Sequence, residues 1–172
     1  AILIGAAACA PTARTGPALE FSACRLPGID RSVRCGSLSV PEDRASPQGR
    51  RIDIQFAVIP ARGRAVEPDP LVVLAGGPGQ GAMALAAQVS AIFGRLNDTR
   101  DIVLVDQRGT GQSHPLDCDP GSVQSILEET LPEDQVRDCL QSLDADPRHY
   151  ATPPAMADLD EILGKLGYAK VN

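Results

Sequence analysis

The chain has 172 residues, of which 43% are hydrophobic and 22% charged, and this composition is typical of one folded domain rather than of a disordered chain. Its formal net charge is −6. Up to Arg64 there are nine arginines against five acidic residues, a balance of +4; beyond it, seven basic residues stand against seventeen acidic ones, a balance of −10. This excess of acid argues against a nucleic-acid partner, because the phosphate backbone attracts basic surfaces.

The first twenty residues differ from the rest of the chain. Ala1–Cys9 is an apolar run of small residues that resembles the end of a secretory signal and is too short to span a bilayer. Because Ala6-Ala7-Ala8-Cys9 resembles a bacterial lipobox, we expect a lipid anchor on Cys9; the alternative is an incidental cysteine in a removed signal peptide. We therefore expect a signal remnant and tether over 1–20, and a folded, exported part over 21–172, in the periplasm or outside the cell.

The other four cysteines fall into two local pairs, Cys24 with Cys35 and Cys118 with Cys139. No cysteine has the Cys-x-x-Cys or Cys/His spacing of a zinc site, so we expect no metal. An exported chain favours disulfides, and four cysteines allow three pairings. We expect the two local pairs, because each brackets its own short segment.

A hairpin is predicted ahead of the central part of the chain. Residues 34–40 give a weak strand signal, and 52–59 give a strong one. In the second segment apolar residues alternate with small or polar ones: Ile52, Ile54, Phe56 and Val58 against Asp53, Gln55 and Ala57. With 41–49 as the turn, we expect an antiparallel hairpin at the edge of a sheet.

The strongest strand signal leads directly into the densest group of glycines. Leu71–Leu74 has the pattern of a strand buried on both faces of a parallel sheet, and the glycines of Ala75–Gly81 then turn the chain. Ala82–Asn97 follows with a helical stripe of Leu85, Val89, Ile92, Phe93 and Leu96, and Ile102–Val105 is a second buried strand. This parallel strand–helix–strand unit predicts an α/β fold, in which ligands bind outside the carboxyl ends of strands, where these glycines lie.

Two helical segments are expected in the acidic second half. The first is polar and broken by Pro132, and its one apolar face consists of Val136, Cys139, Leu140 and Leu143. The last helix has Thr152 as its cap, Pro153 in its first turn and Gly167 at its end. Its apolar stripe consists of Leu159, Ile162, Leu163 and Leu166.

The glycine turn also fits a dinucleotide-binding fingerprint. Gly77-x-Gly79-x-x-Ala82 matches the Rossmann pattern, and Asp106 ends the next strand where a ribose-binding acid would lie. Against this reading, Pro78 removes a backbone donor from the loop, a hairpin precedes the supposed first strand, and export separates the chain from cytosolic cofactor. Dinucleotide binding is therefore the least favoured interpretation.

Two motifs at a fixed separation resemble those of a known family. They are Leu74-Ala-Gly-Gly-Pro-Gly79 and Asp106-Gln-Arg-Gly-Thr-Gly-Gln-Ser113, with Cys24…Cys35-Gly36…Val40-Pro41-Glu42 before them and Ala157-Asp-Leu-Asp160…Leu166-Gly-Tyr168 after them. From about Phe21 to Asn172 the chain resembles exported α/β-hydrolase serine peptidases, in particular proline iminopeptidases and tripeptidyl aminopeptidases. The resemblance implies the amino-terminal part of an α/β-hydrolase fold, a peptide substrate cleaved near its amino terminus, and no cofactor.

The resemblance also implies roles for the two loops. Gly76, Pro78 and Gly79 belong to the oxyanion loop, and the backbone N–H of Gly77 is its donor, in a turn expected to tolerate little side chain. Ala75 stands where family members often carry histidine. In the second loop, Asp106, Gln107, Arg108, Gly109 and Gly111 are expected to brace loops rather than to take part in chemistry.

The residues of a catalytic triad are missing from the sequence. It contains no Gly-x-Ser-x-Gly elbow, and Ser113 lacks the second glycine and the strand-to-helix turn. His114 and His149 are expected at the surface, because the fold places its triad histidine last. The resemblance places a strand starting at Lys170 beside Leu71–Leu74, with the nucleophile, acid and histidine beyond this chain, so we expect the chain alone to be inactive. An esterase of the same fold and a non-catalytic binding module are the alternatives.

Overall fold

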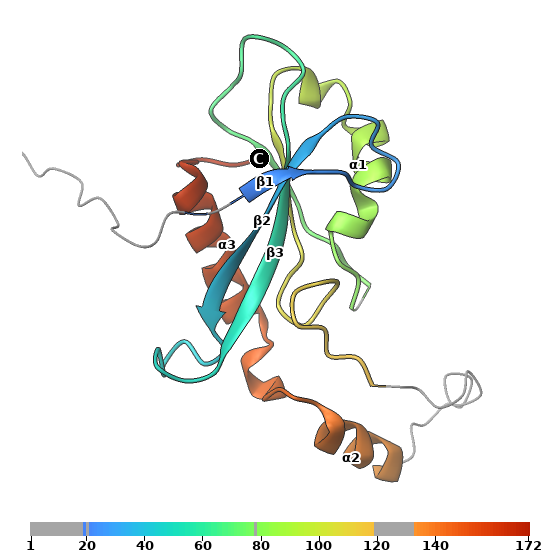
Figure 1. The fold of residues 1–172 in the computed structure, drawn as a ribbon, viewed down its shortest axis with the longest axis vertical. Coiled ribbons are helices and arrows are strands. Elements are labelled where there is room, and N and C mark those ends of the chain that lie inside the picture. Colours follow the sequence, from blue (N-terminus) through green and yellow to red (C-terminus); the bar gives the residue numbers. More distant parts are fainter. Residues whose placement is uncertain (1–18, 20, 78, 119–132) are drawn as a thin grey trace, which may run out of the picture.

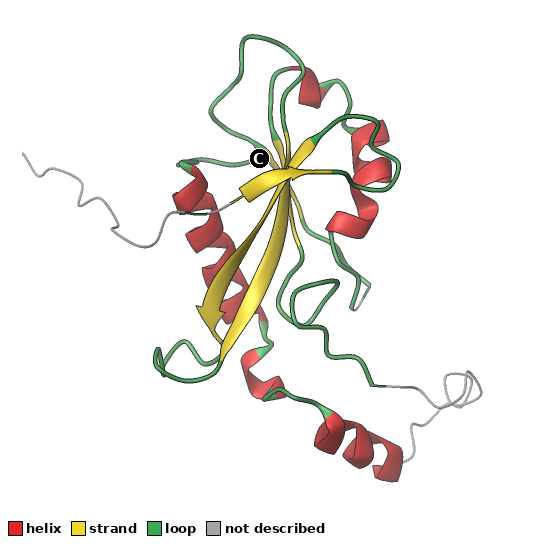
Figure 2. Cartoon of the chain, in the orientation of Figure 1, coloured by secondary structure: helices red, strands yellow, loops and turns green. Residues whose placement is uncertain are grey.

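The structure is a computed structural model that describes residues 19, 21–77, 79–118 and 133–172. This described part is built on a mixed sheet of five strands in the order β1-β2-β3-β5-β4 (Figure 1). The strands are β1 (Phe21–Cys24), β2 (Val33–Pro41), β3 (Arg51–Ile59), β4 (Leu71–Val73) and β5 (Ile102–Val105). The helices are α1 (Ala86–Ile92), α2 (Glu133–Ser142) and α3 (Thr152–Leu166), with 3₁₀ turns η1 (Met83–Leu85), η2 (Leu96–Asp98) and η4 (Pro147–His149) (Figure 2).

The predicted hairpin is formed by β2 and β3. These strands pair antiparallel, from Arg34 opposite Val58 to Pro41 opposite Arg51. The expectation that the hairpin lies at the sheet edge is wrong, because β1 pairs with β2 on one side and β5 pairs antiparallel with β3 on the other. β1 was not predicted, since three of its four side chains are exposed and it has no apolar pattern of its own.

The predicted parallel unit is formed by β4, α1 and β5. β4 and β5 pair in parallel, with Leu71 opposite Ile102 and Val73 opposite Leu104. β5 is fully buried, as predicted. β4 is not: it ends at Val73, its side chains are half-buried, and Leu74 is 49% exposed. The reason is its position, since β4 is the last strand of the described sheet.

The end of the chain lies along the open side of β4. The Asn172 N–H donates to the Pro70 carbonyl at 2.9 Å, and the Asn172 carbonyl accepts from the Val72 N–H at 2.9 Å. This is the hydrogen-bond pattern of a parallel pair. The segment starting at Lys170 therefore lies beside β4 as expected, although residues 169–172 are not themselves a strand.

Helices cover both faces of the sheet, which makes the arrangement α/β (Figure 1). One face packs on the α1 segment, and its buried residues include Ala57, Ile59, Ile102, Leu104, Met83, Ala86 and Val89. The other face packs on α3, and its buried residues include Ile52, Ile54, Phe56, Val58, Val103, Ile162 and Leu163. Both faces of β5 and of the second half of β3 are consequently buried, and these two strands form the centre of the described core.

The α1 segment is shorter than the helix predicted over Ala82–Asn97. It consists of η1, α1 and η2 in succession. The predicted stripe is only partly right, because Ile92 and Leu96 are 63% and 43% exposed. The face that packs on the sheet starts earlier, with Ala82, Met83, Ala86 and Val89.

The two later helices depart from prediction in specific places. α3 begins at Thr152, so this residue is not the cap; Ala151 holds that position without a side-chain bond. Gly167 does end α3, with φ of 85° and an N–H that bonds to the Gly164 and Leu163 carbonyls. α2 has no buried residue, and the apolar face expected there is largely exposed at Val136 and Leu140.

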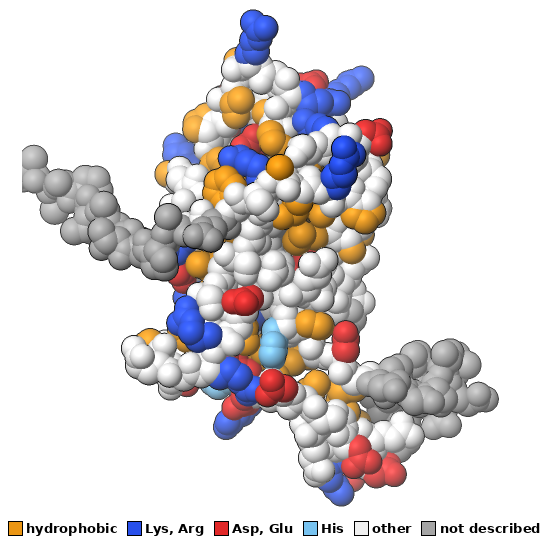
Figure 3. All heavy atoms as spheres, viewed as in Figure 1, with side chains coloured by type: hydrophobic (Ala, Val, Ile, Leu, Met, Phe, Trp, Pro, Cys, Tyr) orange, Lys and Arg blue, Asp and Glu red, His pale blue; other side chains and the backbone are white. Residues whose placement is uncertain are grey.

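Both predicted disulfides are present, Cys24–Cys35 between β1 and β2 and Cys118–Cys139 between the loop after β5 and α2. Their Cα atoms are 5.8 Å and 5.4 Å apart. Cys9 lies outside the described residues. In the ranges that the structure describes, no helix is both long and apolar enough to cross a membrane. On the face shown in Figure 3, acidic side chains gather over α2, and Lys and Arg side chains are concentrated at the opposite end.

Candidate functional site

The glycine turn follows the carboxyl end of β4 and is open to solvent. Gly76, Gly77 and Gly79 are exposed, and φ is +133° at Gly77 and +85° at Gly79. Among the described residues, no group accepts a hydrogen bond from the Gly77 N–H. Pro78 lies outside the described residues. At the mouth of the sheet the turn therefore holds a backbone donor that has no acceptor within the described ranges.

The conformation of this turn, not crowding, limits which residues fit it. A Cβ built on Gly77 would meet its nearest neighbour, the Gln80 Cβ, at 3.5 Å, and one on Gly76 or Gly79 would meet nothing within 4 Å. The expectation that the turn tolerates little side chain is therefore wrong about space. The same expectation is right about backbone geometry at Gly77 and Gly79, because positive φ values of this kind strain any L-residue that has a side chain.

Asp106 connects the glycine turn to the second loop. Its side chain is buried, with Oδ1 accepting from the Met83 N–H at 2.8 Å and Oδ2 from the Gln112 N–H at 3.0 Å. Gly81 and Gly111 lie against the same carboxylate. An Asp106 side chain held in this way is not open to a ribose, which removes the main support for the dinucleotide interpretation.

Arg108 lies deep in the protein, and its hydrogen-bond partners in the described residues lie outside the glycine turn. Its side chain is 0% exposed and pairs with Asp158, from Nε to Oδ2 at 2.6 Å and from Nη2 to Oδ1 at 2.8 Å. Its Nη1 donates to the carbonyls of Glu42 at 2.7 Å and His149 at 2.9 Å. Arg44 also donates to Asp158. The guanidinium therefore joins the second loop, the β2–β3 turn and α3.

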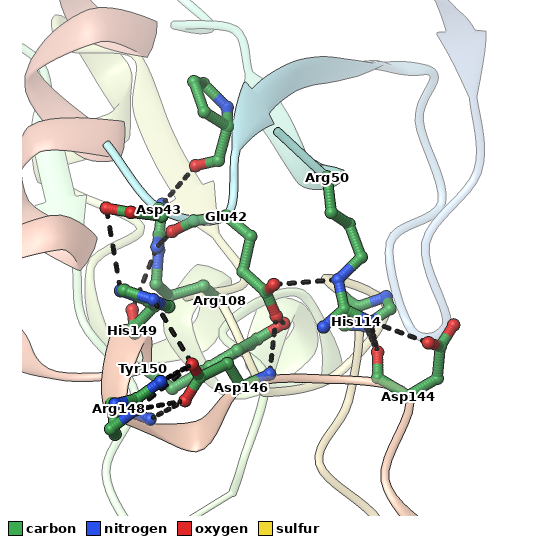
Figure 4. A network of polar contacts seen from close by, with 11 residues as sticks. Glu42, Asp43, Arg50, Arg108, His114, Asp144, Asp146, Arg148, His149 and Tyr150 are labelled. Carbon is green, nitrogen blue, oxygen red and sulfur yellow. Dashed lines mark hydrogen bonds and ion pairs between the residues drawn. The ribbon is translucent and has the colours of Figure 1, made fainter. Parts of the chain in front are cut away.

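Glu42 extends this polar network to the segment before α3 (Figure 4). It accepts from Arg50 at 2.8 Å, from the Asp146 N–H at 2.9 Å and from the Tyr150 hydroxyl at 3.0 Å. Burial raises the pKa of the Glu42 carboxyl, but these three hydrogen bonds outweigh burial and hold the pKa below its ordinary value. Burial, and then the bond to Glu42, raise the pKa of Tyr150.

The rest of the second loop is a tight turn closed on itself. The Gly109 N–H donates to the Ser113 carbonyl at 2.8 Å, and the Thr110 N–H donates to the Gln107 carbonyl at 2.9 Å. Ser113 is fully buried, and its Oγ accepts from the Gln55 N–H at 2.8 Å. A serine in this position supports β3 and has no histidine partner among the described residues.

Both histidines are less exposed than predicted. His114 has φ of 53°, its Nε2 lies 2.9 Å from the Asp144 carbonyl oxygen, and its ring stacks on Tyr150 with centroids 6.2 Å apart. His149 is 30% exposed, with Nε2 3.5 Å from the carboxylate of Asp146. Both belong to the polar network, because the segment before α3 folds back over the second loop. Neither faces the glycine turn through any contact in the described part of the chain.

Sequence reasoning missed Glu42, Tyr150 and Asp158 as organising residues. One signal was available for Asp158, since it lies three residues after Ala155 and four before Ile162, both buried. A charged residue inside an apolar helical stripe indicates a buried partner. In the described residues, no cluster of three or more His, Cys, Asp or Glu side chains is arranged to hold a metal ion.

Comparison with known proteins gives hydrolases. No protein-family model matches the chain. It is 28% identical over 187 aligned residues to the tripeptidyl aminopeptidases of Streptomyces lividans and Streptomyces coelicolor, covering 97% of this chain and 34% of each relative. It is 31% identical over 105 residues to carboxylesterase B of Mycobacterium tuberculosis, covering 58% of this chain and 20% of that protein. The chain thus spans about a third of the length of the tripeptidyl aminopeptidases it matches.

These comparisons agree with the fold at a coarse level. The chain is similar to proteins named as hydrolases, and its mixed sheet with helices on both faces is an α/β arrangement. The two disulfides are consistent with an exported protein.

Proposed function

We propose that this chain is the amino-terminal part of an exported serine hydrolase with the α/β-hydrolase fold, an aminopeptidase that releases proline or short peptides from peptide amino termini. The observation that carries the proposal is the glycine turn after β4, in which Gly77 is exposed and its N–H has no acceptor in the described part of the chain. Similarity to tripeptidyl aminopeptidases over 97% of the chain supports the same assignment.

In this proposal Gly77 stabilises the negative charge that develops on the substrate carbonyl oxygen. A serine hydroxyl attacks the carbonyl carbon, a histidine accepts the serine proton, and an acid orients the histidine. These three residues would come from sequence outside the present chain. The Gly77 N–H would donate to the oxyanion, and one such donor is worth about 3 kcal/mol of transition-state stabilisation. No step requires a metal or an organic cofactor.

An esterase is the alternative, because the same oxyanion hole and triad cleave esters as well as amides. The similarity to carboxylesterase B, at 31% identity, is the observation that favours it. Attachment to a membrane through a lipid on Cys9 is a separate proposal, supported by the sequence Ala6-Ala7-Ala8-Cys9.

Activity of the full-length protein tests the proposal. A tripeptide p-nitroanilide with a free amino terminus should be cleaved faster than its N-acetylated form, and a fluorophosphonate should label and inactivate the enzyme. Cleavage of prolyl p-nitroanilide would distinguish a proline-releasing enzyme from a tripeptide-releasing one. Cleavage of short p-nitrophenyl esters alone would favour the esterase. No hydrolysis and no labelling would refute the proposal.

Gly77→Val tests the oxyanion donor in the full-length enzyme. The strained turn should move the N–H, so kcat should fall by about 10²–10³-fold with a smaller change in KM. Gly167→Val is the matched control, because Gly167 also has positive φ and its added Cβ would meet nothing within 4 Å. The control should lower stability and leave kcat unchanged. A folded Gly77→Val enzyme with normal turnover would remove Gly77 from the mechanism.

A further inference from the structure

Asp106 is a buried carboxylate without a cationic partner. It is 2% exposed, and none of the ion pairs among the described residues involves it. We infer that Asp106 is a positioning residue, which holds the oxyanion turn in its working geometry through backbone hydrogen bonds. This inference rests on the proposed function, since it assigns Asp106 a role in that same site.

The hydrogen bonds of Asp106 join three segments at one point. Oδ1 accepts from the Met83 N–H, directly after the glycine turn, and Oδ2 accepts from the Gln112 N–H in the second loop. The backbone N–H of Asp106 donates to the Gln55 carbonyl of β3 at 3.0 Å. Bonds from backbone N–H groups to a buried carboxylate are charge-assisted and therefore strong. The central sheet is thereby connected to both loops.

Two glycines make room for this carboxylate. A Cβ on Gly81 would lie 2.7 Å from Oδ1 of Asp106, and a Cβ on Gly111 would lie 2.6 Å from its Cγ. The same Gly81 Cβ would lie 2.8 Å from the Cα of Gly111. The two loops therefore touch through their backbones, with the Asp106 carboxylate bonded between them. A side chain at either glycine would push the loops or the carboxylate aside.

This arrangement fixes the glycine turn at both ends. Before the turn, Val73 is paired with Leu104 in the sheet. After the turn, the Met83 N–H is bonded to Asp106, and the Met83 side chain is buried in the core. The exposed Gly77 lies between these two anchors. If the second anchor is lost, the Gly77 N–H is free to shift, and a displacement of about 1 Å at a reacting group can cost about 10²-fold in rate.

Asp101 provides a matched comparison at the other end of β5. Its Oδ1 accepts from the Ala61 N–H at 2.7 Å, and its Oδ2 accepts from the Tyr168 hydroxyl at 2.6 Å. It too is a carboxylate that holds a loop backbone, although it also pairs with Arg34 at 3.4 Å. Among the described residues, its hydrogen bonds and ion pairs reach no residue of the glycine turn. Replacing Asp101 should therefore affect stability without affecting the oxyanion site.

The experiment compares Asp106→Asn with Asp101→Asn in the full-length enzyme. An asparagine keeps the shape of Asp106, but its amide NH₂ faces one of the two backbone donors, so one hydrogen bond is lost. Asp106→Asn should lower kcat by about 10–100-fold with KM nearly unchanged, and should weaken a peptide aldehyde inhibitor in proportion to kcat/KM. Asp101→Asn should leave kcat and the inhibitor constant unchanged. Equal kinetic effects in both variants, or normal kcat in folded Asp106→Asn, would overturn the inference.

Hydrogen–deuterium exchange gives a second test of the role of Asp106, and this test does not depend on enzymatic activity. The Met83 and Gln112 amides should exchange slowly in the wild-type enzyme, and faster in Asp106→Asn but not in Asp101→Asn. Rapid exchange of Met83 in the wild type would overturn the inference even if Asp106→Asn fails to fold. If the wild-type protein hydrolyses none of the substrates, the proposed function fails, and slow exchange would then show Asp106 holding the turn for another purpose.

Discussion

Asp158→Ala should strongly destabilise the protein, because it leaves Arg108 buried without its counter-charge. The Arg108 side chain is 0% exposed and that of Asp158 is 2% exposed. Two parallel hydrogen bonds of 2.6 Å and 2.8 Å join the guanidinium to the carboxylate. Truncation of Asp158 removes both of these charge-assisted bonds at once, together with the bonds that Arg44 donates to the same carboxylate.

The expected loss is about 3–5 kcal/mol in the free energy of unfolding, which is the range for breaking a buried ion pair by removing one partner. Glu161→Ala on the same helix is the control. Glu161 accepts from Arg44 at 3.0 Å, but its side chain is 36% exposed, so its loss should be about 0–1 kcal/mol. Urea unfolding followed by far-UV circular dichroism compares the two variants, provided that the m value is unchanged.

A loss below about 1 kcal/mol for Asp158→Ala, or one equal to that of Glu161→Ala, would refute this reasoning. A double replacement makes the test sharper. Asp158→Leu combined with Arg108→Met should be more stable than Asp158→Leu alone, because no unpaired charge then remains in the core. A double-mutant cycle without coupling energy would show that the pair does not form in solution.

Three further predictions concern the Cys24–Cys35 disulfide, the Tyr168 phenol and the Ser113 hydroxyl. Peptide mapping without reduction should find Cys24 linked to Cys35, and a linkage of Cys24 to any other cysteine would contradict the structure. Replacing both cysteines with serine should lower the free energy of unfolding by about 3 kcal/mol. Burial, and then its bond to Asp101, raise the pKa of Tyr168 to about 12, so its contribution to stability is present below pH 10 and lost between pH 10 and 12. Tyr168→Phe should flatten the stability profile in that window, and an unchanged profile would count against the bond. Ser113→Ala should lower the free energy of unfolding by about 1–2 kcal/mol, because a backbone N–H of β3 loses its acceptor. Fluorophosphonate should still label the full-length Ser113→Ala enzyme. If a folded Ser113→Ala enzyme is not labelled, Ser113 is the nucleophile.

Features that depend on local chemistry could be predicted from the amino-acid sequence alone. The alternation in Ile52–Val58 specified a strand with a buried face, and Ile102–Val105 specified a strand buried on both faces. The spacing of the cysteines indicated both disulfides. Gly167 ended the last helix, because a left-handed residue is needed there. In each case the physical reason acts within one segment, so it can be recognised without knowing its neighbours.

Which segments lie beside one another, in contrast, depends on how the whole chain packs. β1 is a strand because β2 offers it an edge, and β4 is half-exposed because no strand of the described sheet lies on its other side. The partners of the buried carboxylates also come from distant parts of the chain. Asp158 pairs with Arg108, 50 residues before it, and Asp106 accepts a hydrogen bond from the backbone of Met83, 23 residues before it. No local pattern encodes these contacts, because their energy comes from burial that exists only once the sheet, the loops and α3 are packed together.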